Sequence, residues 1–507
     1  MQSPSERPAP TSGEPAPISY SGRSDKMPDY RDQPGFRSRR RRNWFFLGLT
    51  YASYYFCRYN LSPVANDLKR DLGFDNREYG WISSGRDALY AIGQMINGLF
   101  TDRLGGKLAM TIGAIGTVLA NLAFGFACWT NLGGAMLAVL VTIRSVDGYF
   151  QSFGAPGMIK INTAWFPRRE RGGFAGIFGA MINLGAIGAG ELARLLATGV
   201  SITIGATILM MPKLDWRYIF IIPPAATLLC TLLMNIMVRQ QPEELGYGVD
   251  HSDEPPEDPN EVVSLTAVFR RIAANPTVWI VAGAYFCTGV VRRAIETWYA
   301  IYLDDVWHAG RTTPLFRLFA WGLPITATIG SMASGIISDR LFRGRRAPVA
   351  AVLYISQALL TLLALLLPHH GGTGAALTAS MVVIGISMMC NSTHSILGTA
   401  AAMDLGGRKM AGCSSGIIDS FQYFGAILAG AGVGFLFDRF GAPAIAVGGA
   451  LSDVAGGAAV ATAPAGELHV PLSPAIWFGT MLPFSIIGAG LMIYLWIRHG
   501  NTRAPGT

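Results

Sequence analysis

The sequence predicts an all-α membrane protein with twelve transmembrane helices arranged as two pseudo-symmetric bundles of six. The prediction rests on the composition, on the number of long apolar stretches and on an internal repeat. Hydrophobic residues make up 51% of the 507 residues and charged residues only 14%, whereas soluble globular chains are about 25% charged. The 61 glycines and 28 prolines also suit membrane helices better than soluble ones. This composition excludes a soluble enzyme, a nucleic-acid-binding protein and a disordered scaffold.

Twelve apolar stretches are long enough to cross a bilayer, which takes about 20 residues of helix. The stretches begin near Trp44, Tyr79, Leu108, Gly134, Gly172, Trp216, Thr277, Pro314, Ala347, Gly374, Ala411 and Pro474. Residues 441–473 are rich in Gly and Ala, and their pattern favours neither a helix nor a loop.

Polar segments divide the chain into two halves of similar length. From their composition we expect residues 1–42 to be a basic, disordered tail, residues 238–276 an acidic linker, and residues 499–507 a second tail. We expect residues 43–237 and 277–498 to form the two six-helix bundles.

Lys and Arg residues concentrate in alternate loops, on the side that also holds the basic N-terminal tail. Because basic residues accumulate in cytoplasmic loops, we expect both termini in the cytoplasm and the chain in the inner cell membrane. The net charge of +8 has the same origin. The acidic linker and both tails then lie on the cytoplasmic side.

The six cysteines all lie in apolar segments, without a Cys-x-x-Cys pair or a His/Cys cluster. A disulfide scaffold or a metal site is therefore not expected. Nothing in the sequence implies a cofactor.

A short motif recurs in the two halves. Asp102-Arg103 follows the second predicted helix within a Gly-x-x-x-Asp-Arg-x-Gly-x-Lys pattern, and Asp339-Arg340 follows the eighth within Gly-x-x-x-Asp-Arg, 237 residues later. This repeated motif resembles the signature of the major facilitator superfamily. The resemblance implies the major facilitator fold, with Asp102, Arg103, Asp339 and Arg340 acting as a conformational latch on the cytoplasmic side.

Two arginines lie inside predicted membrane helices, at equivalent places in the two halves. Arg58 belongs to the first helix and Arg292 to the seventh, 234 residues later. A guanidinium in the middle of a membrane helix costs about 2.5–3.5 kcal/mol on insertion scales, so its presence points to a function. In a two-fold arrangement of halves, both arginines face a central cavity.

Two opposed guanidinium groups suit a phosphate group above other ligands. Arg binds phosphate with two parallel hydrogen bonds and keeps its charge in a poorly hydrated site. Tyr51 and Tyr55 share the helix face of Arg58 and offer hydroxyl donors. With both arginines unpaired in an empty site, an anion is needed before the halves can reorient.

The alternative is that each arginine neutralises an intramembrane acid. The candidate acids are Asp87, Asp147, Glu191, Glu296 and Asp419. Arg86 adjoins Asp87 and Arg144 lies three residues before Asp147, so these groups are expected to pair locally. Glu296, four residues after Arg292, is the strongest competitor. His394 is interpreted as a hydrogen-bonded polar contact rather than a proton relay.

At further positions the sequence resembles the organophosphate:phosphate antiporter family. Members of this family transport glycerol 3-phosphate, hexose phosphates or phosphoglycerates. The resemblance runs through Tyr51-x-x-x-Tyr55-x-x-Arg58, Tyr90, Lys160, Arg292 and Tyr423. It implies that the substrate is bound by Arg58, Arg292, Tyr51, Tyr55, Tyr90, Gln94, Lys160 and Tyr423. Family members often have Lys where this chain has Gln94, some have His at Ala164, and Gly289 replaces a common Tyr.

The family resemblance implies a monomeric transporter, not an enzyme, that exchanges an organophosphate for inorganic phosphate by alternating access. The neutral donors favour glycerol 3-phosphate or a sugar phosphate over a phosphoglycerate. Two alternatives stay open. One is a membrane sensor of hexose phosphate that partners a histidine kinase. The other is a proton-coupled sugar or drug carrier, favoured if Glu296 and Asp419 line the cavity.

Overall fold

The computed structural model describes the two helical bundles and their main connections. The described residues are 33–130, 132–166, 168–204, 207–248, 274–342, 345–401, 418–440, 445–446, 468–469 and 471–500. Most of the predicted N-terminal tail, most of the linker and most of 441–473 lie outside this part.

Twelve helical segments of the described chain correspond to the twelve predicted helices, and eight of them are long and apolar enough to span a membrane. In the N-terminal half they are α1 (Phe36–Arg58), α3 (Asn76–Leu104), α4 (Gly106–Trp129), α5 (Met136–Gln151) with α6 (Gly154–Trp165), α7 (Arg168–Thr198), and α8 (Ile222–Met237) preceded by a 3-10 turn at Trp216–Phe220. In the C-terminal half they are α10 (Pro276–Trp307), α11 (Pro314–Leu341), α12 (Arg346–Leu366), α13 (Thr373–Ser395), a helical segment from 418 that ends in α15 (Val433–Phe440), and α16 (Pro474–Gly500).

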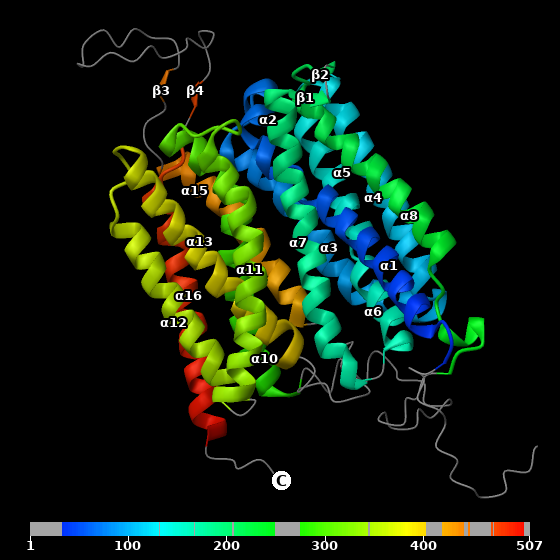
Figure 1. Cartoon of the computed structure of the whole chain (residues 1–507). Helices are drawn as coiled ribbons and strands as arrows, with labels where there is room; N and C mark the ends of the chain where they lie inside the picture. Colours follow the sequence, from blue (N-terminus) through cyan, green and yellow to red (C-terminus); the bar gives the residue numbers. More distant parts are fainter. Residues whose placement is uncertain are drawn as a thin grey trace, which may run out of the picture.

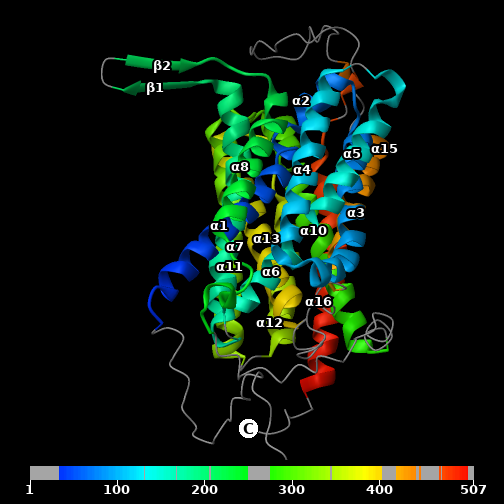
Figure 2. The same cartoon turned by 90° about the vertical axis from the view of Figure 1, so that its right-hand side faces the viewer.

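The two halves stand side by side, with α7 and α11 facing each other between them (Figure 1). Phe36, at the start of α1, and Gly500, at the end of α16, lie at the same end of the bundle, which we call the terminal face. The opposite end carries the short helix α2 (Ala65–Leu72) and a hairpin of β1 (Val200–Ile204) and β2 (Thr207–Met211). Figure 2 shows this hairpin extending sideways, and we call this end the hairpin face.

Local sequence explains several helix ends. Asp75 accepts a hydrogen bond from the backbone N–H of Glu78 at 2.6 Å and begins α3 with a capping box. Asn275 caps α10 and Thr313 caps α11. In both helices the next residue is proline, which is well suited to the first helical position.

Three elements differ from the sequence-based expectation. α1 begins at Phe36, well before Trp44, so residues 39–42 are helical rather than part of a tail; Arg39 donates to the carbonyl of Met237 at 2.8 Å. The fourth predicted helix is interrupted at Ser152 and Phe153, where Pro156 in the new first turn lacks a backbone donor. The β1–β2 hairpin was not predicted.

The halves contact each other closely towards the hairpin face. Arg311 forms an ion pair with Asp67 at 2.7 Å, and Asn66 donates to Asp304 at 2.7 Å. Gly80 of α3 lies against the backbone of Gly430, where an added Cβ atom would clash with the Gly430 carbonyl. These contacts hold the halves together above the centre of the molecule.

Candidate functional site

Arg58 is the last residue of α1 and is buried, with 5% of the residue exposed. The helix ends there because Pro63 follows and does not continue a regular helix. The carbonyl of Arg58 accepts hydrogen bonds from Arg86 at 3.2 Å and from Arg144 at 3.4 Å. Cations at a helix C-terminus are favourable, so these two arginines hold the end of α1 in place.

The Arg58 guanidinium has only neutral partners among the described residues. Its Nε donates to Gln151 at 2.8 Å, its Nη1 to the Tyr423 hydroxyl at 3.5 Å, and it lies over the rings of Tyr55 and Tyr90 at 4.5 and 4.4 Å. Nη2 is buried and has no hydrogen-bond partner in the described part of the chain. A buried donor without a partner costs about 1–3 kcal/mol, and more when charged. Arg58 is therefore poised to receive an anion.

Arg292 lies on α10, in the other half, and is paired more fully. Its Nε donates to Glu296 at 2.9 Å. Its terminal nitrogens contact neutral groups: Tyr59 at 3.5 Å, His394 at 3.3 Å and, with the Gln422 amide oriented to match its neighbours, the Gln422 oxygen at 2.9 Å. The expectation that both arginines are unpaired is therefore wrong for Arg292, because Glu296 neutralises it.

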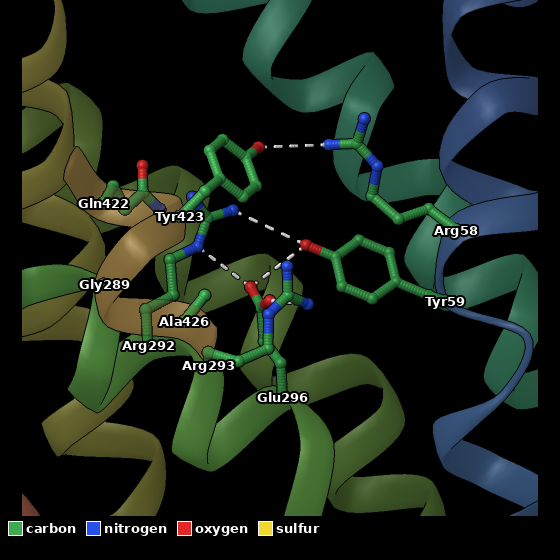
Figure 3. Close-up of a pocket in the computed structure, with 9 residues that line it drawn as sticks. All are labelled: Arg58, Tyr59, Gly289, Arg292, Arg293, Glu296, Gln422, Tyr423 and Ala426. Carbon is green, nitrogen blue, oxygen red and sulfur yellow. Dashed lines mark hydrogen bonds and ion pairs between the residues drawn. The ribbon is translucent and has the colours of Figure 1, made fainter. Parts of the chain in front are cut away.

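A cavity of about 10 Å³ lies between the two arginines (Figure 3). It is lined by Arg58, Tyr59, Gly289, Arg292, Arg293, Glu296, Gln422, Tyr423 and Ala426. Because one water needs about 10–15 Å³ of such space, this cavity has room for about one water. We call it the central cavity. α1 and α10 thus bring the two arginines from opposite halves to one small, polar space.

The other arginines around the central cavity are paired with carboxylates. Asp87 binds Arg86 at 2.5 Å and Arg293 at 2.8 Å, the second pair linking the two halves. Asp147 binds Arg144 at 3.0 Å, and Arg293 also binds Glu296 at 3.0 Å. The local pairs expected from spacing are present. The charged side chains named here are Arg58, Arg86, Arg144, Arg292 and Arg293 against Asp87, Asp147, Glu296 and, near His394, Asp419. Of these arginines Arg58 is the one without a carboxylate partner among the described residues, and Asp419 accepts hydrogen bonds from the neutral side chains of Gln94 and Tyr285.

Only some of the other predicted binding residues lie at the central cavity or against Arg58. Tyr423 lines the central cavity, and Tyr55 and Tyr90 lie against Arg58. Tyr51 packs on Tyr55 at 5.3 Å between ring centres and does not line the cavity. Lys160, on α6, does not line it either.

Gln94 connects to a second polar group beside the cavity. Its amide donates to the Tyr90 hydroxyl at 3.1 Å and to Asp419 at 3.0 Å. Tyr285 donates to Asp419 at 3.3 Å and shares a 2.5 Å hydrogen bond with His394. His394 is thus hydrogen-bonded, as interpreted from the sequence. Glu296 lines the central cavity and Asp419 does not.

Sequence reasoning missed Tyr59, Gln151 and Gln422 as site residues. Tyr59 donates to Glu296 at 3.0 Å, and its position next to Arg58 was a usable signal. Gln151 accepts a hydrogen bond from Arg58 and donates one to Asp147 at 3.0 Å. Its spacing of four residues from Asp147 was a second signal in the sequence. Gln422 reaches the site because Gly289 lets its backbone approach, since an added Cβ there would clash with the Gln422 carbonyl.

The predicted latch residues lie at the terminal ends of two helices, α3 for Asp102 and Arg103 and α11 for Asp339 and Arg340. Both arginines are exposed. The side chains of Asp102 and Asp339 lie outside the described part, so their role stays a prediction.

Comparison with known proteins places the chain among transporters. It is 24% identical to the glycerol-3-phosphate transporter of Bacillus subtilis, over 82% of this chain and 90% of that protein. It is 26% identical to the hexose-6-phosphate:phosphate antiporter of Escherichia coli, over 79% and 85% of the two chains. It is also 26% identical to the E. coli membrane sensor protein UhpC, over 79% and 87%.

A solved structure and a family model point to the same kind of protein as these relatives. The crystal structure of a bacterial homologue of the human lysosomal transporter Spinster superimposes with a TM-score of 0.63 at 18% identity, covering 80% of this chain and 84% of that one. At that identity the likeness shows the fold alone. The sequence model described as Major Facilitator Superfamily matches residues 47–430. The chain therefore belongs to the Major Facilitator Superfamily.

Proposed function

We propose that the protein is a secondary transporter that exchanges an organophosphate for inorganic phosphate by alternating access. One observation carries the proposal: Arg58 is buried, has no carboxylate partner in the described chain, and shares a cavity with Arg292 of the opposite half. The printed names of the relatives, a glycerol-3-phosphate transporter and a hexose-6-phosphate:phosphate antiporter, support the same ligand class.

The chemistry of the site fits a phosphate group. Phosphate at pH 7 carries nearly two negative charges, one for Arg58, which has no carboxylate partner among the described residues, and one for Arg292. Arg58 offers its free Nη2, and Arg292 offers terminal nitrogens that contact only neutral groups. The hydroxyls of Tyr59 and Tyr423 lie beside them and can donate to further phosphate oxygens.

Binding requires a rearrangement, because the central cavity has room for about one water. Glu296 occupies the Nε edge of Arg292 and also binds Arg293. We propose that an arriving phosphate displaces Glu296 from Arg292, and that Glu296 keeps its pair with Arg293. The site then exchanges one anion for another, so neither state leaves two arginines unpaired. In the empty site Arg58 still lacks an anion among the described residues, so reorientation of the halves is expected to depend on a bound phosphate or organophosphate.

The arrangement of the halves supports alternating access. Phosphate held by Arg58 and Arg292 joins the two halves at their centre. The contacts Arg311–Asp67 and Asn66–Asp304 then have to part when the cavity opens towards the hairpin face. We propose that the terminal face lies on the cytoplasmic side, because Lys and Arg residues accumulate in cytoplasmic loops. We further propose that the chain is a monomer in the inner membrane.

Counterflow in liposomes tests the proposal. Purified protein is reconstituted with internal phosphate, and uptake of labelled phosphate is measured against glycerol 3-phosphate, glucose 6-phosphate, 3-phosphoglycerate and phosphoenolpyruvate. We expect uptake only when the liposomes contain phosphate or an organophosphate, and inhibition by at least one organophosphate. Absence of phosphate exchange, with folded protein in the bilayer, contradicts the proposal.

The same assay separates two other candidates. The likeness to the membrane sensor UhpC favours a sensor, which would bind a hexose phosphate without exchanging it. Glu296 in the cavity wall favours a proton-coupled carrier, which would respond to a pH gradient and ignore phosphate as a competitor.

A further inference from the structure

A second, larger cavity adjoins the central cavity. It measures about 70 Å³, against about 10 Å³ for the central one. The two share Tyr59, Arg292 and Glu296 in their walls. The second cavity extends from these residues between α7, α10, α11 and α13, and we call it the annex. The organic part of a ligand whose phosphate lies at Arg292 can therefore extend directly into the annex.

We propose that the annex receives the organic part of the organophosphate and selects an uncharged part that carries hydroxyl groups. The inference rests on the proposed function, because it assumes that a phosphate group binds at Arg58 and Arg292. It adds residues that neither the sequence patterns nor the names of the relatives assign to binding: Asn183, Asn391 and Tyr299.

The polar groups of the annex have unused hydrogen-bonding capacity. Asn391 donates its amide to the Ser387 carbonyl at 2.9 Å and to the Ser387 hydroxyl at 3.2 Å, which fixes its orientation. Asn183 donates to Thr328 at 2.5 Å. Neither amide oxygen, nor the Tyr299 hydroxyl, has a hydrogen-bond partner among the described residues, and none of them is sealed from the cavity. Two acceptors and one hydroxyl are therefore available to a ligand's hydroxyl groups.

Much of the remaining annex wall is apolar, although Ser62 and Ser387 also line it. Tyr299 stacks on Phe319 with the rings 5° from parallel and 6.1 Å apart, and Leu323 and Ile295 lie nearby in the lining. Such surfaces suit the C–H faces of a polyol, while its hydroxyls reach the amide oxygens.

Charge in the annex disfavours a second anionic group. Among the lining residues the charged ones are Arg292 and Glu296, both shared with the central cavity. Once phosphate occupies Arg292, a carboxylate in the annex meets Glu296 and finds no cation of its own, which is costly in a poorly hydrated space. A phosphoglycerate is therefore a poor fit, and a neutral polyol is a good one.

The size of the annex favours a short polyol. Its 70 Å³ correspond to about five to seven water-sized positions at 10–15 Å³ each. The three-carbon part of glycerol 3-phosphate needs about that many positions, whereas a hexose requires the walls to move.

The test uses two variants and one matched control in the liposome assay. Tyr299→Phe removes only a hydroxyl, and Asn391→Leu removes only the amide at similar volume. Tyr302→Phe removes a hydroxyl from the same helix, but Tyr302 contacts His369 at 3.2 Å and does not line the annex. For each protein, labelled phosphate uptake is inhibited by unlabelled phosphate, glycerol 3-phosphate and 3-phosphoglycerate. Melting temperature and elution volume report on folding.

We expect both annex variants to keep phosphate self-exchange within about twofold, while the glycerol 3-phosphate needed for half-inhibition rises about five- to tenfold. Tyr302→Phe leaves both values unchanged. In the wild type, glycerol 3-phosphate inhibits at lower concentration than 3-phosphoglycerate.

Three results would overturn the inference while leaving phosphate exchange intact as the proposed function. One is unchanged potency of glycerol 3-phosphate in both variants. Another is a parallel loss of phosphate self-exchange and glycerol 3-phosphate inhibition in a folded variant, which would make the annex a mere support for the central cavity. The third is stronger inhibition of the wild type by 3-phosphoglycerate. Absence of phosphate self-exchange in the wild type would instead refute the proposed function itself.

Discussion

Arg292 and Glu296 lie one turn apart on α10 and form an ion pair of 2.9 Å between Nε and Oε1. The pair places a carboxylate of the protein at one of the two guanidinium groups proposed to bind phosphate. Arg58, in the opposite half, has no carboxylate partner among the described residues. The two arginines occupy equivalent positions in the two halves of the sequence, but only Arg292 has a carboxylate partner among the described residues. We therefore expect changes to the carboxylate beside Arg292 to alter phosphate binding.

Glu296→Gln is expected to tighten phosphate binding. The change removes the internal anion that competes for Arg292, so the apparent affinity for phosphate should rise at least threefold. Without ligand, the variant should be less stable, because breaking a buried ion pair leaves an uncompensated charge worth about 3–5 kcal/mol. The rise in melting temperature on adding phosphate should therefore exceed that of the wild type.

Glu191→Gln is the control for that measurement. Glu191 is paired with Arg194 at 2.8 Å and is 18% exposed, close to the 19% of Glu296, but it does not line either cavity. Its loss should leave phosphate affinity unchanged. Weaker phosphate binding by Glu296→Gln would show that Glu296 orients Arg292 and does not compete with the ligand.

Asp87→Asn is expected to weaken the connection between the halves. Asp87 is fully buried and joins Arg86 to Arg293 of the other half at 2.8 Å. Arg86 then loses its anion and Arg293 keeps only Glu296, with a cost of about 3–5 kcal/mol, and the melting temperature should fall. Asp71→Asn, at partly exposed pairs with Arg70 and Arg217 and a hydrogen bond from Trp216, should cost less, because exposed ion pairs are worth about 0–1 kcal/mol each. Equal stability of the two variants would contradict a structural role for the Asp87–Arg293 pair.

The latch residue Asp102 is expected to act on conformation and not on ligand binding. Asp102→Asn should slow phosphate exchange and change the labelling of single cysteines placed on the two faces. Phosphate affinity should barely move, because Asp102 lies near the terminal end of α3, away from the arginines. A collapse of affinity with unchanged labelling would refute the latch.

Much of the fold follows from the sequence, because the length of the apolar stretches and the Lys and Arg residues in alternate loops are strong local signals of membrane helices and their orientation. The pairs Arg86–Asp87 and Arg144–Asp147 follow from spacing along one helix. The β1–β2 hairpin was not predicted, although Val200-Ser-Ile-Thr-Ile204 alternates as a strand does, because so short an alternating run is a weak signal between two long apolar stretches.

The parts of the site that were missed depend on contacts between distant segments. Gln422 enters the cavity only because Gly289 admits its backbone. Asn183 and Asn391 come together with Tyr299 across three helices, in positions that no spacing along the chain reveals. Tyr51 and Lys160 were expected in the site from family resemblance, yet the central cavity is lined by Tyr59 and Gln422 instead.

Phosphate exchange by Arg58→Lys and Arg292→Lys tests the central claim most directly. Lys keeps the charge but loses the planar fork of donors. Labelled phosphate uptake is measured in phosphate-loaded liposomes, with Arg217→Lys as the control, since Arg217 pairs with Asp215 and does not line either cavity. We expect each site variant to insert and fold normally and to exchange phosphate at least tenfold more slowly, while the control stays near the wild-type rate. Near-normal exchange by either site variant would contradict the proposed site.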